Sequence, residues 1–218
     1  MIIKPPLAVF SDFDGTISSC DTWVFLLEKF GPPEWTEIEK QMLRGELTEK
    51  EGFAMEIASL RTSWDIALKT TLKSITIDRY FSDFVNVLAE AEIPFKVVSG
   101  GILPMIEALL KKAGIANVEI RANDVEVNGD KWRLIPAKSP SIKGLCNHCK
   151  THWLREKKEQ GYQIVYIGDG HTDRCPAECA DIVFAKAELA KYCRKNGMEF
   201  QPFDSFRNII SFLNKADI

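Results

Sequence analysis

The feature that most constrains this chain is an apolar run, Leu7 to Phe10, followed closely by the acids Asp12 and Asp14. The run has the length and composition of a short buried strand, and Gly15 breaks it. Such a strand delivers both carboxylates to the carboxyl edge of an open α/β sheet, where ligands bind. Two neighbouring anions repel unless a cation lies between them, so the pair indicates a hard divalent metal. An acidic turn without a metal is an equal alternative for this motif alone.

A second segment repeats this design. The apolar run from Gln163 to Ile167 is followed by Gly168-Asp169-Gly170 and then, four residues after Asp169, by Asp173. The two glycines allow the backbone to turn sharply and to approach a ligand closely. Asp169 is therefore expected at another strand end, within reach of the same cation.

Two further segments supply groups that bind anions. A strand from Pro94 to Val98 leads into Ser99-Gly100-Gly101, where a hydroxyl and unhindered backbone N–H groups precede a helix expected over Ile102–Ala113. The start of a helix is a good anion site. Lys150 opens another helix, expected over residues 151–160, which leads directly into the Asp169 strand.

In this order the four segments resemble the motifs of the haloacid dehalogenase-like phosphohydrolases. The matching positions are Asp12-Phe13-Asp14-Gly15-Thr16, Ser99-Gly100, Lys150 and Gly168-Asp169-Gly170-His171-Thr172-Asp173. The resemblance spans nearly the whole chain, and four ordered motifs are far more specific than any one of them. It implies a phosphatase that works through an aspartyl-phosphate intermediate. A phosphate-ester binding protein without turnover is disfavoured, because all the expected catalytic groups are present.

The resemblance also implies roles for these residues. Asp12 is the expected nucleophile, and Asp14 is the expected general acid and then base. Magnesium would be held by Asp12, the backbone carbonyl of Asp14 and Asp169, while Asp173 orients a water or helps to fix the metal shell. The groups expected at the phosphoryl oxygens are Ser99, the Gly100 amide, Lys150 and Thr16. For Thr16, capping a helix is an equal alternative.

Two lysines compete for the phosphate-binding role. Lys143 lies seven residues before Lys150. The position of Lys150 favours it, because it starts the helix whose end feeds the Asp169 strand. Between the two lies Cys146-Asn147-His148-Cys149, which raises the question of a structural zinc or a labile disulfide. Zinc sites usually need two well-spaced ligand pairs, so a turn that positions Lys150 is the favoured interpretation.

Strands and helices alternate from Phe81 onward, which predicts an α/β fold with a doubly wound, mostly parallel, Rossmann-like sheet. Further helices are expected over Tyr80–Glu90, Pro176–Ala180 and Ser205–Lys215, with a strand over Asp181–Phe184. From Cys20 to Arg79 the apolar spacing is helical throughout, and the resemblance implies a helical cap there. The predicted domains are a core of residues 1–19 and 80–218 and a cap of residues 20–79. A hairpin is expected from Val125 to Leu134, because Asn128-Gly129 favours a tight turn.

The substrate is constrained by the cap. Phosphoserine phosphatases share the helical cap, but they pair the substrate with a glutamate and an arginine. This chain has Asp21 at the matching place and no arginine from Phe53 to Ala58. A substrate carboxylate would be left without a partner there, so phosphoserine is disfavoured.

Closer similarity is to the enol-phosphate phosphatases of methionine salvage. The resembling residues are Pro32-Pro33-Glu34-Trp35, Glu51-Gly52, Ile93-Pro94-Phe95, Ser99-Gly100-Gly101 and Cys149-Lys150. Trp23, Phe53 and Met55, with Asp21, are the candidate substrate contacts of the cap, since apolar side chains suit a thioether tail. The same side chains at helical spacing also suit a plain core. The Gly168–His171 sequence is typical as well of relatives that hydrolyse phosphocholine, phosphoethanolamine or pyridoxal phosphate, and these stay alternatives.

Composition sets the remaining expectations. The 218 residues carry a formal net charge of -3, which gives no reason to expect nucleic acid or an anionic membrane as a partner. No apolar run approaches the roughly 20 residues of a membrane span, and the N-terminus has no signal-peptide pattern. Six cysteines are compatible with a reducing compartment. We therefore expect a cytoplasmic enzyme for a small phosphate monoester, as a monomer or homodimer.

Overall fold

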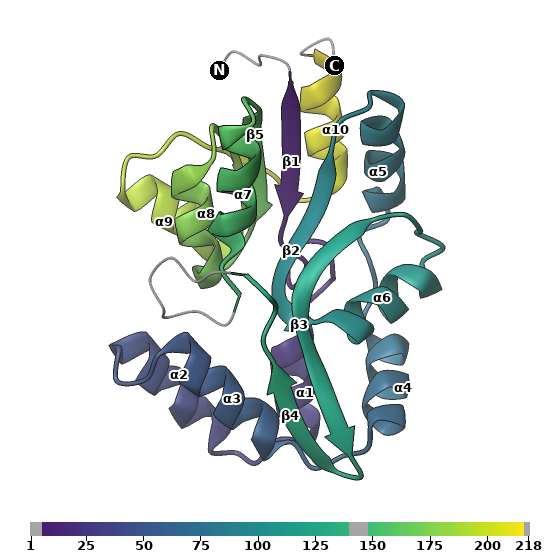
Figure 1. The fold of residues 1–218 in the computed structure, drawn as a ribbon, viewed down its shortest axis with the longest axis vertical. Coiled ribbons are helices and arrows are strands. Elements are labelled where there is room, and N and C mark those ends of the chain that lie inside the picture. The colour runs from purple at the N-terminus through teal and green to yellow at the C-terminus, as the bar shows by residue number, and fades with distance from the viewer. Residues whose placement is uncertain (1–5, 140–147, 216–218) are drawn as a thin grey trace.

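A seven-stranded sheet organises the fold in the computed structural model, which describes residues 6–139 and 148–215 (Figure 1). The strand order is β4-β3-β2-β1-β5-β6-β7, and every neighbouring pair is parallel except the antiparallel β3 and β4. The strands are β1 (Leu7–Ser11), β2 (Phe95–Ile102), β3 (Glu119–Asn128), β4 (Lys131–Ile135), β5 (Gln163–Gly168), β6 (Ile182–Ala185) and β7 (Gln201–Pro202). This architecture confirms the predicted α/β fold with a mostly parallel sheet.

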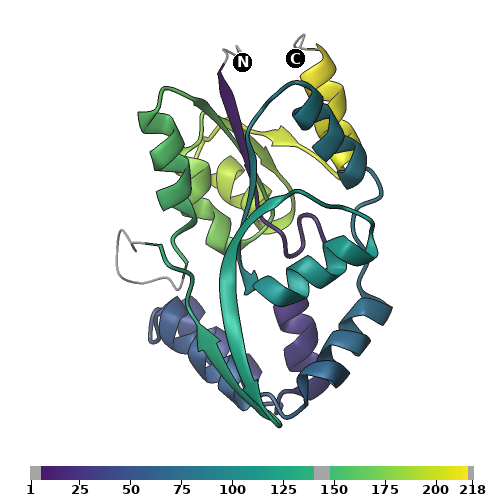
Figure 2. The same cartoon turned by 45° about the vertical axis from the view of Figure 1, so that its right-hand side comes forward.

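Helices cover both faces of the sheet (Figures 1 and 2). On one face lie α7 (Lys150–Glu159), α8 (Arg174–Cys179) and α9 (Ala187–Lys195); on the other lie α5 (Phe81–Glu90), α6 (Leu103–Lys112) and α10 (Phe206–Lys215). Successive residues of β1 alternate between the two cores: Ala8 and Phe10 pack towards α7–α9, and Val9 packs towards α5 and α10. The helices predicted in this half of the chain begin and end within two residues of the observed bounds.

Four helices form a separate layer beyond the carboxyl end of β1 (Figures 1 and 2). They are α1 (Thr22–Phe30), α2 (Trp35–Arg44), α3 (Glu49–Ser59) and α4 (Trp64–Ser74), and we call them the helical segment. The chain enters and leaves this segment at adjacent points, because Ser18 pairs with Ile77 and the N–H of Ser19 donates to the carbonyl of Thr76 at 2.8 Å. Helices are thus found where the cap was expected, while the division into core and cap domains stays a prediction.

The β3–β4 hairpin joins the sheet to the helical segment. The turn occurs where it was predicted, with Gly129 at φ +64°. However, β3 is longer than expected, since its first half pairs with β2 and its second half continues past β2 and pairs with β4 (Figure 2). Trp132 on β4 is buried, stacks on Trp64 with ring centroids 5.8 Å apart, and donates from Nε1 to the carbonyl of Thr62 at 2.7 Å.

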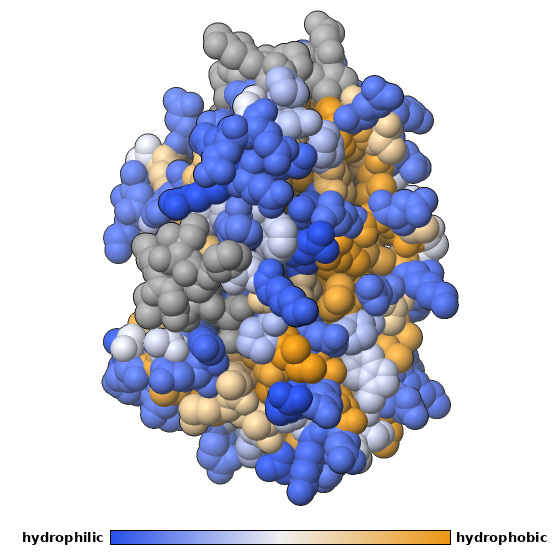
Figure 3. Space-filling view, in the orientation of Figure 1, coloured by the Kyte–Doolittle hydropathy of each residue, from blue (hydrophilic) through white to orange (hydrophobic). Residues whose placement is uncertain are grey.

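The face of the molecule seen in Figure 3 shows hydrophobic side chains between larger areas of hydrophilic ones. The exposed large hydrophobic residues among those described are Leu43, Met55, Ile66 and Ile135. Within the described residues, every helix is too short or too polar to cross a membrane.

Replacing Trp132 by alanine is expected to lower the free energy of unfolding by about 3–5 kcal/mol, because it removes a buried indole and leaves a cavity. Urea-induced unfolding measures this change. The matched control is Ile66→Ala, where the side chain is 56% exposed and a surface substitution changes stability by about 0.5 kcal/mol or less. Equal losses in the two variants would contradict the packing of the hairpin on the helical segment.

Candidate active site

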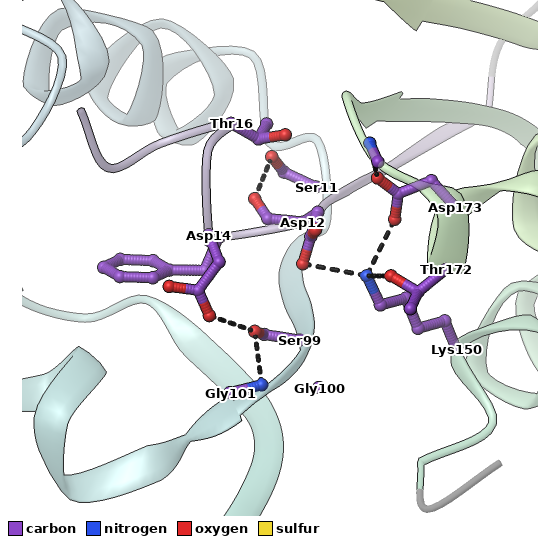
Figure 4. Close-up of polar contacts among 12 residues, drawn as sticks. Ser11, Asp12, Asp14, Thr16, Ser99, Gly100, Gly101, Lys150, Thr172 and Asp173 are labelled. Carbon is purple, nitrogen blue, oxygen red and sulfur yellow. Dashed lines mark hydrogen bonds and ion pairs between the residues drawn. The ribbon is translucent and has the colours of Figure 1, made fainter. Parts of the chain in front are cut away.

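Asp12, Asp14, Ser99 and Lys150, four of the predicted site residues, meet at the carboxyl edge of the central strands (Figure 4). Asp12 and Asp14 follow β1, Ser99 lies in the last half of β2, and Asp169 follows β5. β1 is flanked by β2 and β5 in parallel register, so these strand ends are neighbours. Lys150, the first residue of α7, completes the group. Local sequence therefore decides which side chain each strand delivers, and the sheet order decides that they meet.

Lys150 forms the central ion pairs of the site. Its Nζ lies 2.9 Å from Asp12 Oδ1 and 2.7 Å from Asp173 Oδ1, and all three side chains are buried. Burial disfavours the ammonium form, but the charges of Asp12 and Asp173 outweigh it and raise the pKa of Lys150 above its usual value. Lys150 is thus a permanent cation beside Asp12. Lys143, the competing lysine, lies outside the described residues.

Asp173 accepts from four donors. Oδ1 accepts from Lys150 Nζ and from the Tyr166 hydroxyl at 2.6 Å, and Oδ2 accepts from the N–H groups of Asp169 and Gly170, each at 2.9 Å. A Cβ at Gly168 would lie 2.6 Å from Asp173 Oδ2, so the turn needs glycine there. Both oxygens of Asp173 are occupied by protein donors. It therefore shapes the turn that carries Asp169 and holds Lys150, while its predicted role beside a metal stays a prediction.

Asp14 lies against the start of α1. Its Oδ1 accepts from the N–H and the hydroxyl of Thr22, at 2.8 and 2.5 Å, and the Ser99 hydroxyl lies 3.5 Å from Oδ2. A Cβ at Gly101 would lie 2.3 Å from Asp14 Oδ2, so glycine permits this close approach. Burial raises the pKa of Asp14 to about 7, helped by the charge of Asp21 and opposed by the hydrogen bonds from Thr22. Asp14 can therefore change protonation state near neutral pH.

Thr16 has a partner that the sequence did not predict. Its hydroxyl donates to Asp169 Oδ1, and the residue is 1% exposed. It is absent from the residues that line the cavity, and Asp21 is the residue that caps α1. The structure thus places Thr16 as a support for Asp169, in place of the phosphate contact or helix cap expected from the sequence.

The carboxylates fit a divalent cation. Among the described residues, Asp12, Asp169 and Asp173 offer oxygens that all lie within 4.8 Å of one another. Burial and the charge of Asp173 raise the pKa of Asp12 well above its usual range, and the same causes raise the pKa of Asp169 to about 6. Lys150 lowers both pKa values, but its effect is smaller than that of burial. Oxygen ligands in an acidic cluster are what Mg²⁺ and Ca²⁺ prefer, so Asp12 and Asp169 could hold such an ion.

A cavity of about 490 Å³ opens over these groups. Its floor is Asp12, Asp14, Ser99, Gly100, Lys150 and Asp169, and its other wall belongs to the helical segment. Asp21, Trp23 and Phe53 line that wall, and the centroids of the two aromatic rings lie 4.8 Å apart; their contact with substrate stays a prediction. Met55 does not line the wall: it is 47% exposed and lies two residues after Phe53, about 200° around α3. The structure therefore corrects the expectation that Met55 contacts substrate.

Several residues of this cavity wall were not predicted from the sequence. They are Met42, Leu43, Leu47, Glu39 and Glu49, from α2, the α2–α3 turn and the first turn of α3. Glu49 is partly buried, and burial raises its pKa to about 7, against the pull of Lys150. Only the amphipathic pattern of α2 could have indicated a lining face, and it does not say what that face covers.

The segment Cys146–Cys149 is described only at His148 and Cys149, and these two residues are not arranged as a zinc site. Cys149 is a free, buried thiol, and Cys146 lies outside the described residues. His148, which the zinc hypothesis included, uses both ring nitrogens in hydrogen bonds to the protein.

Asp173→Asn is expected to cost about 3–5 kcal/mol of unfolding free energy, because an amide cannot accept from all four donors and Lys150 loses one of its two buried carboxylate partners. Glu188→Gln is the matched control, since it removes the acid of an exposed pair with Lys191 and is worth about 1 kcal/mol or less. Urea unfolding of both variants measures the difference. A loss at Asp173 no larger than at Glu188 would contradict the four-donor arrangement.

Comparison with known proteins gives matches over nearly the whole chain. A family model described as haloacid dehalogenase-like hydrolase matches residues 9–178. The chain is 31% identical to Pdp3-interacting factor 1 of Schizosaccharomyces pombe, over 99% of this chain and 98% of that protein. It is 30% identical to the 2-hydroxy-3-keto-5-methylthiopentenyl-1-phosphate phosphatase of Geobacillus thermodenitrificans, over 99% of each.

A solved structure of a phospho-aspartyl intermediate analogue of phosphoserine phosphatase has the same fold. It superposes with a TM-score of 0.72 over 96% of this chain and 99% of that chain, at 20% sequence identity. These matches confirm the resemblance that the four motifs predicted.

Proposed function

This chain belongs to the haloacid dehalogenase-like hydrolase family and is a phosphatase, and from that premise we propose that it hydrolyses a small phosphate monoester through an aspartyl-phosphate on Asp12, with Mg²⁺. The observation that carries the proposal is the placement of Lys150 between Asp12 and Asp173 (Figure 4), with Asp14 and Asp169 lining the same cavity. A carboxylate nucleophile, a titratable acid and a fixed cation thus share one cavity.

The proposed reaction has two steps. An oxygen of Asp12 attacks phosphorus, the bond to the alcohol oxygen breaks, and protonated Asp14 gives that oxygen its proton. Asp14, now ionised, takes a proton from a water, which attacks phosphorus and releases Asp12 and inorganic phosphate. A pKa of about 7 suits a group that must donate in one step and accept in the next.

Neutralisation of charge is the other requirement of phosphoryl transfer. Lys150 and the Ser99 hydroxyl, with the backbone at Gly100, line the cavity floor on the side of Asp12. The magnesium ion, bound through Asp12, Asp169 and the Asp14 carbonyl, would supply the remaining positive charge. Asp173 and Thr16 hold the supporting positions behind Lys150 and Asp169.

Asp14→Asn is expected to lower kcat/KM, which reports the first step, by about 100-fold or more for an alkyl phosphate, since general acid catalysis contributes typically 10²–10⁴. The loss should shrink with p-nitrophenyl phosphate, whose leaving group needs no proton. In the parent enzyme, kcat/KM should fall as the pH rises above about 7, because ionised Asp14 cannot donate. The pH profiles with both substrates measure these effects, with the exposed acid variant Glu28→Gln as the control. Equal losses for both leaving groups would contradict the role of Asp14.

For the substrate we propose the enol-phosphate of methionine salvage. Relatives 29–30% identical over more than nine-tenths of the chain carry the name of that phosphatase. The apolar part of the wall, which includes Trp23, Met42 and Phe53, suits a thioether tail. Phosphoserine fits less well: among the described lining residues the helical segment offers no lysine or arginine for a carboxylate, and Arg61 donates to the carbonyls of Ala58 and Leu60.

A second candidate is an amino-alcohol phosphate, such as phosphoethanolamine or phosphocholine. It is favoured by three acids, Asp21, Glu39 and Glu49, that line the cavity from the helical segment beside the aromatic pair. Carboxylates and aromatic faces together attract an ammonium group.

A screen of phosphate monoesters with Mg²⁺ tests the proposal. It includes the salvage intermediate, phosphoethanolamine, phosphocholine, phosphoserine and pyridoxal phosphate. We expect the highest kcat/KM for the salvage intermediate, loss of activity with EDTA, and loss of activity in Asp12→Asn but not in the exposed control Asp65→Asn. An active Asp12→Asn variant would overturn the proposal.

The same screen separates the two substrates. If the amino-alcohol phosphate is the substrate, Glu39→Gln should lower its kcat/KM by roughly tenfold while sparing neutral esters, as expected when a charged contact is lost. If the salvage intermediate is the substrate, the variant should keep its kcat/KM for that ester.

A further inference from the structure

The phosphate-binding loop, Ser99–Gly101, is a bulge in β2. Val98 pairs with Arg121 and Ile102 with Asn123, so three residues of β2 face the single residue Ala122 of β3. The bulge pushes these residues towards the cavity, which all three line. Because bulged residues leave the regular ladder, their carbonyl groups need other partners to fix the backbone.

His148 is the partner of the first carbonyl. Its Nδ1 lies 2.8 Å from the carbonyl oxygen of Ser99, and Trp153 Nε1 lies 2.8 Å from its Nε2. An indole nitrogen only donates, so Nε2 must accept, and the ring proton must lie on Nδ1. His148 therefore donates to Ser99. The ring is 3% exposed, and burial lowers its pKa to about 4, which keeps it neutral.

Asn123 is the partner of the second carbonyl. Its Nδ2 donates to the carbonyl of Gly100 at 2.7 Å, and its Oδ1 accepts from the N–H of Ala137 at 2.9 Å. The side chain is fully buried. Because each end of the amide has a partner of the right kind, its orientation is defined.

Two held carbonyls define two peptide planes. The carbonyl of one residue and the N–H of the next are trans in one plane, so holding the Ser99 carbonyl directs the Gly100 N–H the opposite way. Holding the Gly100 carbonyl likewise directs the Gly101 N–H, which donates to Ser99 Oγ at 3.0 Å. Because Ser99 Oγ accepts from the Gly101 N–H, its hydroxyl proton is free to point towards Asp14 Oδ2, which lies 3.5 Å from Oγ.

We propose that His148 and Asn123 are positioning residues of the phosphoryl site, and that Trp153 fixes the tautomer in which His148 works. The proposal rests on the proposed function, since it takes the Ser99 loop as the binder of phosphoryl oxygens. His148 lies two residues before Lys150. The segment from His148 to Lys150 therefore supplies the cation of the site and also holds the Ser99 loop in place.

The ring tautomer gives a test that does not depend on activity. The chain has three histidines, so two-bond ¹H–¹⁵N spectra of the labelled protein resolve them. We expect His148 as the Nδ1–H tautomer, neutral at pH 6, and a mixture of tautomers in Trp153→Phe. An Nε2–H tautomer at His148 in the parent protein overturns the positioning proposal and leaves the phosphatase proposal standing.

Two substitutions at His148 test the consequence for catalysis. In His148→Asn the amide nitrogen stands as many bonds from the backbone as Nδ1 and can still donate, whereas His148→Phe cannot. We expect the phenylalanine variant to lose roughly 10–100-fold in kcat and to weaken inhibition by inorganic phosphate, because small misplacements of a binding group have effects of that order. The asparagine variant should keep most of both.

The control is His152→Phe, at a ring that packs on Trp153 with centroids 5.0 Å apart but, within the described residues, has no hydrogen bond to the Ser99 loop. It should match the parent. Equal losses in the two His148 variants, or unchanged phosphate inhibition in His148→Phe, overturn the proposal. If His148→Phe does not fold, Trp153→Phe replaces it with the same two readouts. A parent protein that hydrolyses no ester but shows the Nδ1–H tautomer overturns the proposed function and the role assigned to the clamp with it.

Discussion

The buried ion pairs of Lys150 with Asp12 and Asp173 are the interaction on which the site depends. A buried lysine is costly unless its charge is paired and hydrogen-bonded, and here the two carboxylates and the Thr172 hydroxyl surround it. The three charged side chains come from the end of β1, the turn after β5 and the start of α7. The ion pairs therefore form only when these three elements are correctly packed together. The same contacts that stabilise this edge of the fold also place a cation against Asp12, the proposed nucleophile.

These contacts leave the site with more negative charge than positive. Asp12, Asp14 and Asp169 all have raised pKa values, with burial as the largest cause in each. Lys150 alone does not offset them, and a phosphate ester would add further negative charge. A dication held by these acids would offset that charge when an anionic substrate binds, which supports the proposed metal site. The acids of the helical segment extend the negative potential along the opposite wall. In the proposed function this wall faces the leaving group of the substrate, so experiments can identify the leaving group by changing these acids.

The site floor was predictable from sequence because each motif is local. A short apolar run, a glycine and an acid specify a strand end, and the order of parallel strands brings such ends together. The wall was not predictable in the same way. Whether Met42 or Met55 reaches the cavity depends on the rotation of α2 and α3 about their axes, which long-range packing decides. Thr16 shows the same limit: its sequence position fits a phosphate contact, but the neighbouring Asp169 offers its hydroxyl a charged acceptor.

The strand β3 connects parts of the site that the sequence presents as separate. In its middle, Asn123 holds the carbonyl of Gly100, and at its end the hairpin turns back into β4, where Trp132 packs on the helical segment. β4 in turn lies against α3, the helix that carries Phe53 into the cavity. Any movement of the helical segment away from the sheet must break the Trp132 contacts or bend β3 along with it. The cavity wall formed by the helical segment and the Ser99–Gly101 loop, which we propose binds phosphate, are therefore connected through one strand.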